Sequence, residues 1–475
     1  MRVLFPTGTQ SAAVLERELQ TSEGFDWEVI AIGDVASFLT KAQLKTLINE
    51  HPADCVVVSG MCTADFSSVE HETGIPIYRG TRHAADIRRC FPQIAAGTLS
   101  RVQAADILLE DRIREETAAR LEQNEEKAHG YCTLRNIKFG GTSRIKVLCE
   151  IMDAHRRTDL RERACRALAE GADGIDLGFG FDAEPADVIR CFQELESLPC
   201  VLSIDTLNPA LIKASLFRAD IIISLTYDTL DELTEDIRAS QTAVVLIPRD
   251  DHPLPETIAK AQGLGLDVLF ADSLLQPPLS GMTATLAEFL QEYGIPKFMG
   301  CVNVTELVDA DSPGICALLA AMAAECGCAM VLVSEHSDKT QGAVREMRRA
   351  VDLMQASAGR PYPKDAGCDV FVIKEKRKRR EPVPIYDSVI DVAGVPENPV
   401  FDPKGNFRIG IEDGKIVAVR HGKAIRGNTA EEVFAAILAE NGVSLLDHAA
   451  YLGRELYKAE LSIRFGRSFE QDGTF

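Results

Sequence analysis

The sequence lacks the features that would assign it to a membrane or to a secretory pathway. None of its 475 residues falls in a run approaching 18 uninterrupted apolar residues, so no membrane span and no membrane partner are expected. The first residues, MRVLFPTGTQ, lack the apolar core of a signal peptide and are typical of a buried strand and turn. We therefore expect a cytoplasmic protein.

Net positive charge is also missing. The formal net charge is -21, whereas binding to nucleic-acid phosphates needs a basic surface, so no nucleic-acid partner is expected. One basic run, KEKRKRR, extends from Lys374 to Arg380. It could contact an anionic ligand, but a solvated loop or strand edge is the preferred interpretation.

The cysteines do not have the spacing of metal or disulfide sites. The chain has 13 Cys and no CxxC pair, and Cys326 with Cys328 forms a CxC in an apolar run. Most of the others lie inside predicted strands and helices. This pattern predicts reduced, buried thiols rather than zinc ligands or disulfides.

The length and composition predict two or three globular domains, because 475 residues are too many for one small core. Residues 1–130 alternate predicted strands and helices and end in a charged helix, which predicts a flavodoxin-like three-layer α/β domain with a connector helix. The loop PTGTQS after the first strand resembles a phosphate cradle, although a plain strand-to-helix turn explains it equally well.

The central residues, 143–358, contain short β-rich apolar segments separated by amphipathic stretches of helical length. Eight such β/α units in about 210 residues predict a closed (β/α)8 TIM barrel, with an open doubly wound sheet as the alternative. The predicted strands are 145–151, 174–178, 201–204, 220–225, 243–247, 267–270, 297–301 and 329–333.

Residues 366–475 break this pattern and predict a small α+β domain. Strand-like runs at 370–373, 407–411 and 416–419 precede two helical stretches. The last of these places His448 and Glu455 on one helix face, which suits either a docking or ligand surface or, as we prefer, a packed terminal helix.

Polar side chains gather where the predicted barrel strands end, and chemistry in TIM barrels takes place at those ends. The candidate ligand-binding residues are Glu150, Asp153, Asp176, Asp205, Ser224, Arg249, Asp272, Asn303 and His336. So many acids and amides in one space are costly unless a ligand pairs with them. A heterocycle with a guanidine-like edge, such as a pterin, would donate N–H groups to the carboxylates. For Asp205 and Asp272 a helix N-cap is the alternative.

Two segments carry a resemblance to a known barrel family. EGADGIDLGFGF at 170–181 and LSIDTLNPALIKASL at 202–216 resemble segments of the pterin-binding barrel shared by dihydropteroate synthases and pterin-dependent methyltransferases. The resemblance implies that Asp205 and Asp272 bind the pterin edge and that Asp176 supports the pocket. It also implies that His336 lies near an anion site.

The chain departs from the synthase pattern at three strand ends. It has Ser224 in place of an Asn on strand four, and Asn303 lies where the synthases carry an Arg and a Lys. Glu150 and Asn303 are instead similar to positions in the methyltransferase branch. The barrel therefore combines motifs of the synthase branch with motifs of the methyltransferase branch.

The whole chain is similar to the archaeal-type dihydropteroate synthase-like proteins, on the segments 74–87, 303–314 and 446–461. The resemblance implies a role linked to tetrahydromethanopterin, with a possible homodimer. A synthase would condense a dihydropterin-6-methyl diphosphate with an arylamine such as ribofuranosylaminobenzene phosphate.

Loss of diphosphate from that substrate needs positive charge at the leaving group. Candidate anion-binding residues are Arg156, Arg157 and Lys339, although a solvated helix start explains the two arginines equally well. Mg²⁺ held by Glu150 or Asp153 is a further source of charge.

Two other functions remain open. A pterin-dependent methyltransferase or methyl-tetrahydropterin-binding protein needs no diphosphate clamp. The flavodoxin-like domain resembles corrinoid-binding modules but has no DxHxxG segment, so there is no direct sign of a corrinoid. A non-catalytic pterin-binding scaffold is the third possibility.

Overall fold

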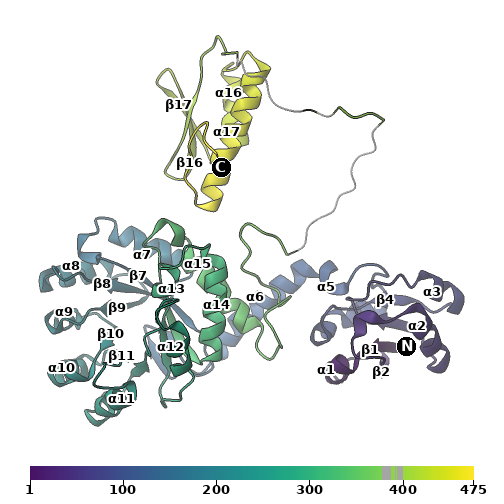
Figure 1. Cartoon of the computed structure of the whole chain (residues 1–475), viewed down its shortest axis with the longest axis horizontal. Helices are drawn as coiled ribbons and strands as arrows, with labels where there is room; N and C mark the ends of the chain where they lie inside the picture. Colours follow the sequence, from purple (N-terminus) through teal and green to yellow (C-terminus); the bar gives the residue numbers. More distant parts are fainter. Residues whose placement is uncertain (377–386, 391, 393–399, 475) are drawn as a thin grey trace.

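The computed structural model describes residues 1–376, 387–390, 392 and 400–474. Arg377 to Arg380 of the basic run lie outside these ranges. The described chain forms an N-terminal α/β unit, a central barrel and a small C-terminal unit (Figure 1). Within these ranges, no helix combines the length and the apolar character that a membrane span requires.

The N-terminal unit is a parallel sheet with the strand order β2-β1-β3-β4. Successive residues of β1 face opposite sides of the sheet, with Val3 and Phe5 in one apolar cluster and Leu4 in another. Helices on both faces cover these clusters, which explains why strands such as CVVV at Cys55–Val58 are wholly apolar. The strands are β1 (Arg2–Thr7), β2 (Asp26–Ala31), β3 (Cys55–Val58) and β4 (Ile77–Arg79), and the helices are α1 (Thr9–Leu19), α2 (Lys41–Glu50), α3 (Ser67–Thr73) and α4 (Phe91–Ala96).

A connector leads from this unit to the barrel. It comprises α5 (Ala105–Leu108), the charged helix α6 (Glu110–Lys127), which packs against a barrel helix, and a hairpin of β5 (Cys132–Leu134) and β6 (Ile137–Phe139). Phe139 of the hairpin is fully buried and joins the cluster inside the barrel, with its ring edge-on to Phe270. The hairpin was not predicted, because three-residue strands leave little periodicity to detect.

The central strands close into a parallel barrel in the order β7-β8-β9-β10-β11-β12-β13-β14, which confirms the predicted TIM barrel (Figure 1). The strands are β7 (Lys146–Ile151), β8 (Gly174–Gly178), β9 (Val201–Asp205), β10 (Ile221–Leu225), β11 (Ala243–Leu246), β12 (Leu269–Ala271), β13 (Lys297–Gly300) and β14 (Cys328–Ser334). Side chains such as Leu148 and Ile221 fill the interior, whereas Val147 and Ile222 face the surrounding helices. These helices are α7 (Leu160–Ala169), α8 (Pro185–Leu195), α9 (Pro209–Ser215), α10 (Tyr227–Ser240), α11 (Leu254–Gly263), α12 (Met282–Glu288), α13 (Val302–Thr305), α14 (Ser312–Glu325) and α15 (Ala343–Ala356).

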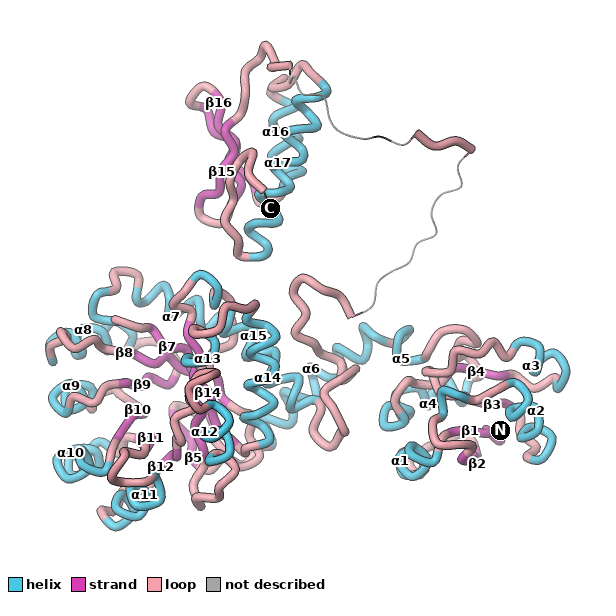
Figure 2. The backbone as a smooth tube through the Cα atoms, viewed as in Figure 1, coloured by secondary structure: helices cyan, strands magenta, loops and turns pink. Residues whose placement is uncertain are grey.

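The segment after α15 returns to the connector instead of forming the strand predicted at 370–373, so that prediction was wrong (Figure 2). The Thr117 hydroxyl of α6 donates to the carbonyl oxygen of Ala366 at 3.1 Å. Val370 packs with Ala366 against α6 and α15. The apolar run is therefore explained by packing of an irregular strap rather than by a sheet.

The C-terminal unit is α+β, as predicted, with an antiparallel sheet of β15 (Arg408–Glu412), β16 (Lys415–Arg420) and β17 (Lys423–Gly427). Strand β17 was missed because charged residues interrupt its apolar pattern. Helices α16 (Ala430–Ala439) and α17 (Leu446–Phe465) pack on the sheet. His448 and Glu455 of α17 are buried, so the helix is packed into its own unit rather than presenting a docking face.

All 13 cysteines are free thiols, and ten of them are buried, as their positions in apolar segments predict. Burial raises the pKa of several of these thiols, for example Cys149 and Cys316. These groups are therefore core side chains rather than reactive nucleophiles.

Candidate functional site

Three acids meet inside the barrel where neighbouring strands end. The parallel register aligns Glu150 of β7 with Asp176 of β8, and Asp176 with Ser203 of β9. Asp205 lies two residues beyond Ser203 and therefore on the same face of β9. Carboxylate oxygens of Glu150, Asp176 and Asp205 all lie within 4.8 Å of one another.

A glycine provides the space for this cluster. Gly178 pairs with Asp205 in the register of β8 and β9. A Cβ atom at Gly178 would lie 3.1 Å from Oε1 of Glu150, which is tighter than an ordinary contact. A larger residue at this position would therefore displace the Glu150 carboxylate.

Asp176 is the most deeply placed member of the cluster. It is fully buried, and its Oδ1 accepts a hydrogen bond from the Ser203 hydroxyl. Its Oδ2 is buried without a hydrogen-bond partner among the described residues. Burial, and then the charges of Asp205 and Glu150, hold the pKa of Asp176 well above its ordinary value. A buried acceptor of this kind is costly unless a ligand or a proton satisfies it.

Asp205 accepts a hydrogen bond from Ser224, a residue with an unusual backbone conformation. Burial raises the pKa of Asp205, and a hydrogen bond from Ser224 opposes that rise. Ser224 has φ of 72°, in the left-handed region, and the pairing of β10 with β11 shifts register between Ile222 and Leu225. Such strain and irregularity at a strand end are typical of positions where a side chain is re-aimed toward a site.

Asp272 follows β12 directly and completes the acidic set. Its Oδ1 accepts a hydrogen bond from the Leu274 N–H at 2.8 Å. Burial, with a contribution from the charge of Asp205, raises the pKa of Asp272 to about 7. The N-cap of α9 is Asn208 rather than Asp205, and α12 begins ten residues after Asp272, so neither acid is a helix cap.

Burial and mutual repulsion raise the pKa values of these acids, and no basic side chain among the described residues opposes that rise. Burial and the charges of Asp205 and Glu306 raise the pKa of Glu150 to about 7. Among the described residues, no Lys or Arg is a cause of the pKa shifts of Glu150, Asp176, Asp205 or Asp272. The site therefore favours a neutral or cationic ligand, or protons shared between its carboxyl groups.

The predicted anion-binding residues do not assemble into one site. Arg156 is 61% exposed and pairs with Asp182 at 2.6 Å, and Lys339 pairs with Asp309 at 2.8 Å. Arg157 donates from Nε to the carbonyl oxygen of Met152 at 3.2 Å. The exposure of Arg156 supports its interpretation as a solvated residue after the strand.

The other predicted ligand residues lie after the barrel strands, in the segments at the carboxyl end of the barrel. Asn303 in α13, Arg249 and His336 are exposed. The His336 N–H donates to Oε1 of Glu306 at 3.2 Å. Asp153 is half-buried in a left-handed turn after β7, beside Arg156.

A metal ion would fit the three acids of the cluster better than the predicted pair of Glu150 and Asp153. Glu150, Asp176 and Asp205 each offer one carboxylate oxygen within 4.8 Å of the others, and Asp153 is outside this group. The unpartnered Oδ2 of Asp176 suits a hard divalent cation, which prefers oxygen ligands.

Two polar residues near the cluster were not predicted. Ser203 shares a strand face with Asp205, and this could have been read from the two-residue spacing within LSID. Glu306 accepts hydrogen bonds from the Thr340 hydroxyl at 2.8 Å and from backbone N–H groups after β14. Glu306 thus links the loop after β13 to the loop after β14, and no local pattern in the sequence indicates such a contact.

Comparison with known proteins adds three findings on sequence. Residues 401–472 match the family model PterinBD-DUF4346. The uncharacterized protein MJ0107 of Methanocaldococcus jannaschii is 32% identical over an alignment 520 positions long, which covers 99% of this chain and 98% of that protein. A Ycf91-like protein of Nostoc sp. is 37% identical over 83 residues, covering 15% of this chain and 64% of its own length.

Solved structures of dihydropteroate synthases are similar to part of the chain. The Thermus thermophilus enzyme has 21% identity and a TM-score of 0.37, and covers 45% of this chain and 94% of its own. The Xanthomonas albilineans enzyme has 20% identity and a TM-score of 0.38, with coverage of 46% and 94%.

Proposed function

Since the chain belongs to the same family as the uncharacterized protein MJ0107 of Methanocaldococcus jannaschii, we propose that proteins of this type bind a pterin in the barrel, at the buried carboxylates. The observation that carries the proposal is the set of Glu150, Asp176, Asp205 and Asp272. Asp176 and Asp272 are buried and the other two are half-buried, and among the described residues no Lys or Arg is a cause of their raised pKa values. Such a set needs a ligand that donates several hydrogen bonds.

A pterin matches this requirement in polarity. Its pyrimidine edge carries N–H donors in a guanidine-like arrangement, and paired N–H groups bind a carboxylate strongly. Asp205 and Asp272 would accept from this edge, and the free oxygen of Asp176 would accept from a further ring N–H. Two further observations support a pterin: the barrel segments 170–181 and 202–216 resemble those of pterin-binding barrels, and the family model matched by the C-terminal unit is named for a pterin-binding domain.

The reaction that suits the site best is transfer of a one-carbon group carried by a reduced pterin. A methyl group leaves a ring nitrogen more easily when that nitrogen is protonated, so a nearby acid promotes the transfer. With a pKa of about 7, Glu150 is poised to share a proton with the ring near neutral pH. The acidic surroundings would stabilise the protonated, cationic pterin and would repel an anionic leaving group.

A dihydropteroate synthase-like reaction in tetrahydromethanopterin biosynthesis is the second candidate, and one observation favours it. Arg157, Arg163 and Arg166 line the same small cavity as Glu150, of about 30 Å³, so three cations lie near the end of β7. A divalent ion held by Glu150, Asp176 and Asp205 would supply further positive charge toward a diphosphate. The substrates would be a dihydropterin-6-methyl diphosphate and an arylamine.

Two assays on the purified protein distinguish these functions. Binding of a methylated tetrahydropterin is measured by calorimetry, and diphosphate release is followed with dihydropterin-6-methyl diphosphate and the arylamine. Binding without diphosphate release is expected. Diphosphate release above the rate of an Asp205→Asn variant would establish the synthase instead. Binding of neither pterin would refute the proposal for the barrel.

A third result would identify a scaffold. Binding of the methylated pterin with no transfer of its methyl group to thiol or corrinoid acceptors would leave a pterin-binding protein without catalysis. Asp267→Asn is the matched control for these assays, because Asp267 is exposed and precedes the same strand that Asp272 follows.

A further inference from the structure

The N-terminal unit contains a cavity of about 480 Å³ that the barrel site does not use. It lies beyond the carboxyl ends of β1, β3 and β4, and the loops after these strands form its walls. Strands β1 and β3 are neighbours at the centre of the order β2-β1-β3-β4, and this is where the chain reverses its direction of winding. In open parallel sheets, ligands bind at this reversal, and ligand sites typically have volumes of roughly 300 to 1,000 Å³.

The cavity is completed by a segment that follows the barrel in the chain. Arg360, Pro361 and Tyr362 follow the last barrel helix and form one wall. The Tyr362 ring meets the His83 ring edge-on, with centroids 5.6 Å apart. The Arg360 guanidinium donates two hydrogen bonds to Asp86, at 2.6 and 2.9 Å. The wall is therefore fixed to the N-terminal unit rather than resting on it.

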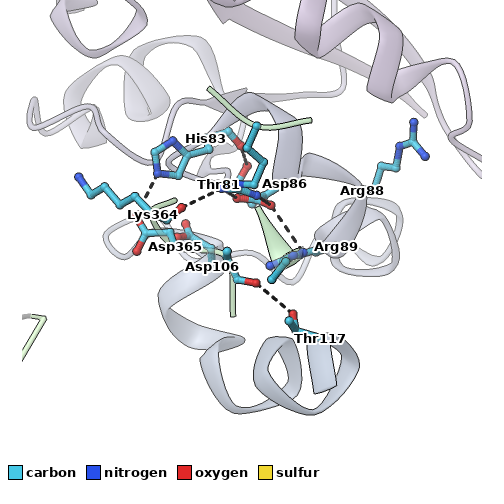
Figure 3. Close-up of polar contacts among 12 residues, drawn as sticks. Thr81, His83, Asp86, Arg88, Arg89, Asp106, Thr117, Lys364 and Asp365 are labelled. Atoms are coloured by element: carbon cyan, nitrogen blue, oxygen red, sulfur yellow. Dashed lines mark hydrogen bonds and ion pairs between the residues drawn. The ribbon is translucent and has the colours of Figure 1, made fainter. Parts of the chain in front are cut away.

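The cations beside the cavity are already paired. Arg82 binds Asp106 at 2.7 Å and Asp365 at 2.9 Å. Nε2 of His83 lies 3.0 Å from Asp365, and Figure 3 shows this cluster of His83, Asp106 and Asp365. Carboxylates balance the charge of Arg82 and lie against Nε2 of His83, so these side chains offer little to a phosphate group.

The start of α1 is also unsuited to a phosphate. The Thr9 N–H donates to the carbonyl oxygen of Gly33, and the Thr9 hydroxyl donates to the Asp34 carboxylate at 3.3 Å. A Cβ atom at Gly8 would lie 2.5 Å from the Asp34 carbonyl oxygen. The glycine of PTGTQS thus allows two loops to pack closely, and the segment is a strand-to-helix turn rather than an open phosphate cradle.

What the cavity offers instead is an apolar floor and several hydroxyl groups. Phe5, Val57 and Ile87 are buried and line the floor. Hydroxyl groups line the rest of the cavity, from Thr7, Ser11, Ser37, Ser59, Thr81 and Tyr362. Those of Thr7 and Ser11 bond to each other at 2.8 Å, and that of Thr81 donates to the carbonyl oxygen of His83 at 2.7 Å, so Ser37, Ser59 and Tyr362 are the hydroxyl groups that suit a ligand best. We propose that this cavity is a second small-molecule site, for an uncharged aromatic heterocycle of nucleoside size with hydrogen-bonding groups at its edge.

The test measures binding of defined probes to the full-length protein by saturation-transfer NMR. The probes are adenosine, guanosine and riboflavin, each beside its 5′-monophosphate. At least one uncharged probe is expected to bind, and its monophosphate to bind about tenfold more weakly, a difference of about 1.4 kcal/mol. No binding of any uncharged probe at about 1 mM would overturn the proposal, as would a monophosphate that binds more tightly.

Variants then locate the probe. Ser37→Trp places an indole in the cavity and should abolish binding, and Tyr362→Ala removes one wall and should weaken it about tenfold. Tyr457→Ala is the control, because Tyr457 on α17 is 53% exposed and Tyr362 is 49% exposed. Full binding in both cavity variants would overturn the assignment. Loss of binding in the barrel variant Asp205→Ala would also overturn it, because the probe would then occupy the barrel.

Discussion

Ser203 donates its hydroxyl to one oxygen of Asp176, and the other oxygen of that carboxylate is buried without a hydrogen-bond partner among the described residues. The single bond fixes the orientation of Asp176 while one acceptor stays available inside the barrel. With Glu150 and Asp205 so close, the folded protein favours protonated carboxyl groups at this point. The site is therefore built at a cost in stability that depends on pH.

The first prediction concerns this pH dependence. The folded-state pKa of Glu150 and of Asp272 is about 7, above the ordinary carboxyl values. A raised carboxyl pKa stabilises the fold below the ordinary value, and this contribution is lost as pH rises through the folded value. The barrel should therefore become less stable between about pH 4.5 and 7, by about 3 kcal/mol for Glu150.

Scanning calorimetry of Glu150→Gln at pH 5 and pH 8 tests this prediction. The variant lacks the titrating group, so its barrel transition should shift less with pH than that of the wild type and should be the more stable at pH 8. Glu122→Gln, at an exposed position on α6, should follow the wild type. Parallel pH curves for Glu150→Gln and the wild type would show that Glu150 ionises normally.

The second prediction concerns ligand binding. Asp205→Ala and Asp272→Ala should each weaken binding of a reduced pterin by roughly 2–4 kcal/mol, because each leaves ring N–H groups without an acceptor. Titration calorimetry measures the change, with Asp267→Ala as the exposed control. Unchanged affinity in both site variants would place the pterin elsewhere.

The third prediction separates the hydrogen bond of Ser224 from its backbone strain. Ser224→Ala keeps a side chain at φ of 72° and loses the bond to Asp205, whereas Ser224→Gly loses the bond but relieves the strain. Both should weaken pterin binding about tenfold, about 1.4 kcal/mol. The glycine variant should be the more stable of the two by about 1 kcal/mol in calorimetry. Equal stability would show that the left-handed turn is not strained.

The strand ends of the barrel could be predicted because short β-rich runs and helical spacing are local signals. LSID placed Asp205 at the end of β9, and GIDLG placed Asp176 in β8, within a residue of the structure. Their meeting follows from the parallel register, since alignment of β7 with β8 and of β8 with β9 is a general consequence of barrel closure.

The pairing of charged side chains could not be predicted in the same way. Arg156 and Lys339 follow barrel strands and were candidates for binding an anion, but they contact Asp182 and Asp309 from neighbouring loops. Loop conformation decides such pairs, and no periodic pattern encodes it. The same holds for Asp86, whose partner Arg360 is 274 residues away.

The fourth prediction tests that distant pair, which fastens the strap after the barrel to the N-terminal unit. The side chains of Arg360 and Asp86 are only 11% and 3% exposed. Arg360→Met would leave Asp86 buried with Arg89, at 3.6 Å, as its remaining partner (Figure 3). Removing one member of a buried pair is costly, so unfolding of the N-terminal unit should become easier by about 2–3 kcal/mol.

Trp27 provides the measurement, because it is the one tryptophan of the chain and lies in β2. Urea unfolding followed by its fluorescence therefore reports on the N-terminal unit. Adding Asp86→Asn to Arg360→Met should recover most of the loss, since no ionised carboxylate is then left buried. Lys45→Met, in an exposed pair with Glu72 of the same unit, should change stability by less than about 0.5 kcal/mol. If the Arg360 variant unfolds like the wild type, the strap does not stabilise the N-terminal unit, and the wall of its cavity is free to open.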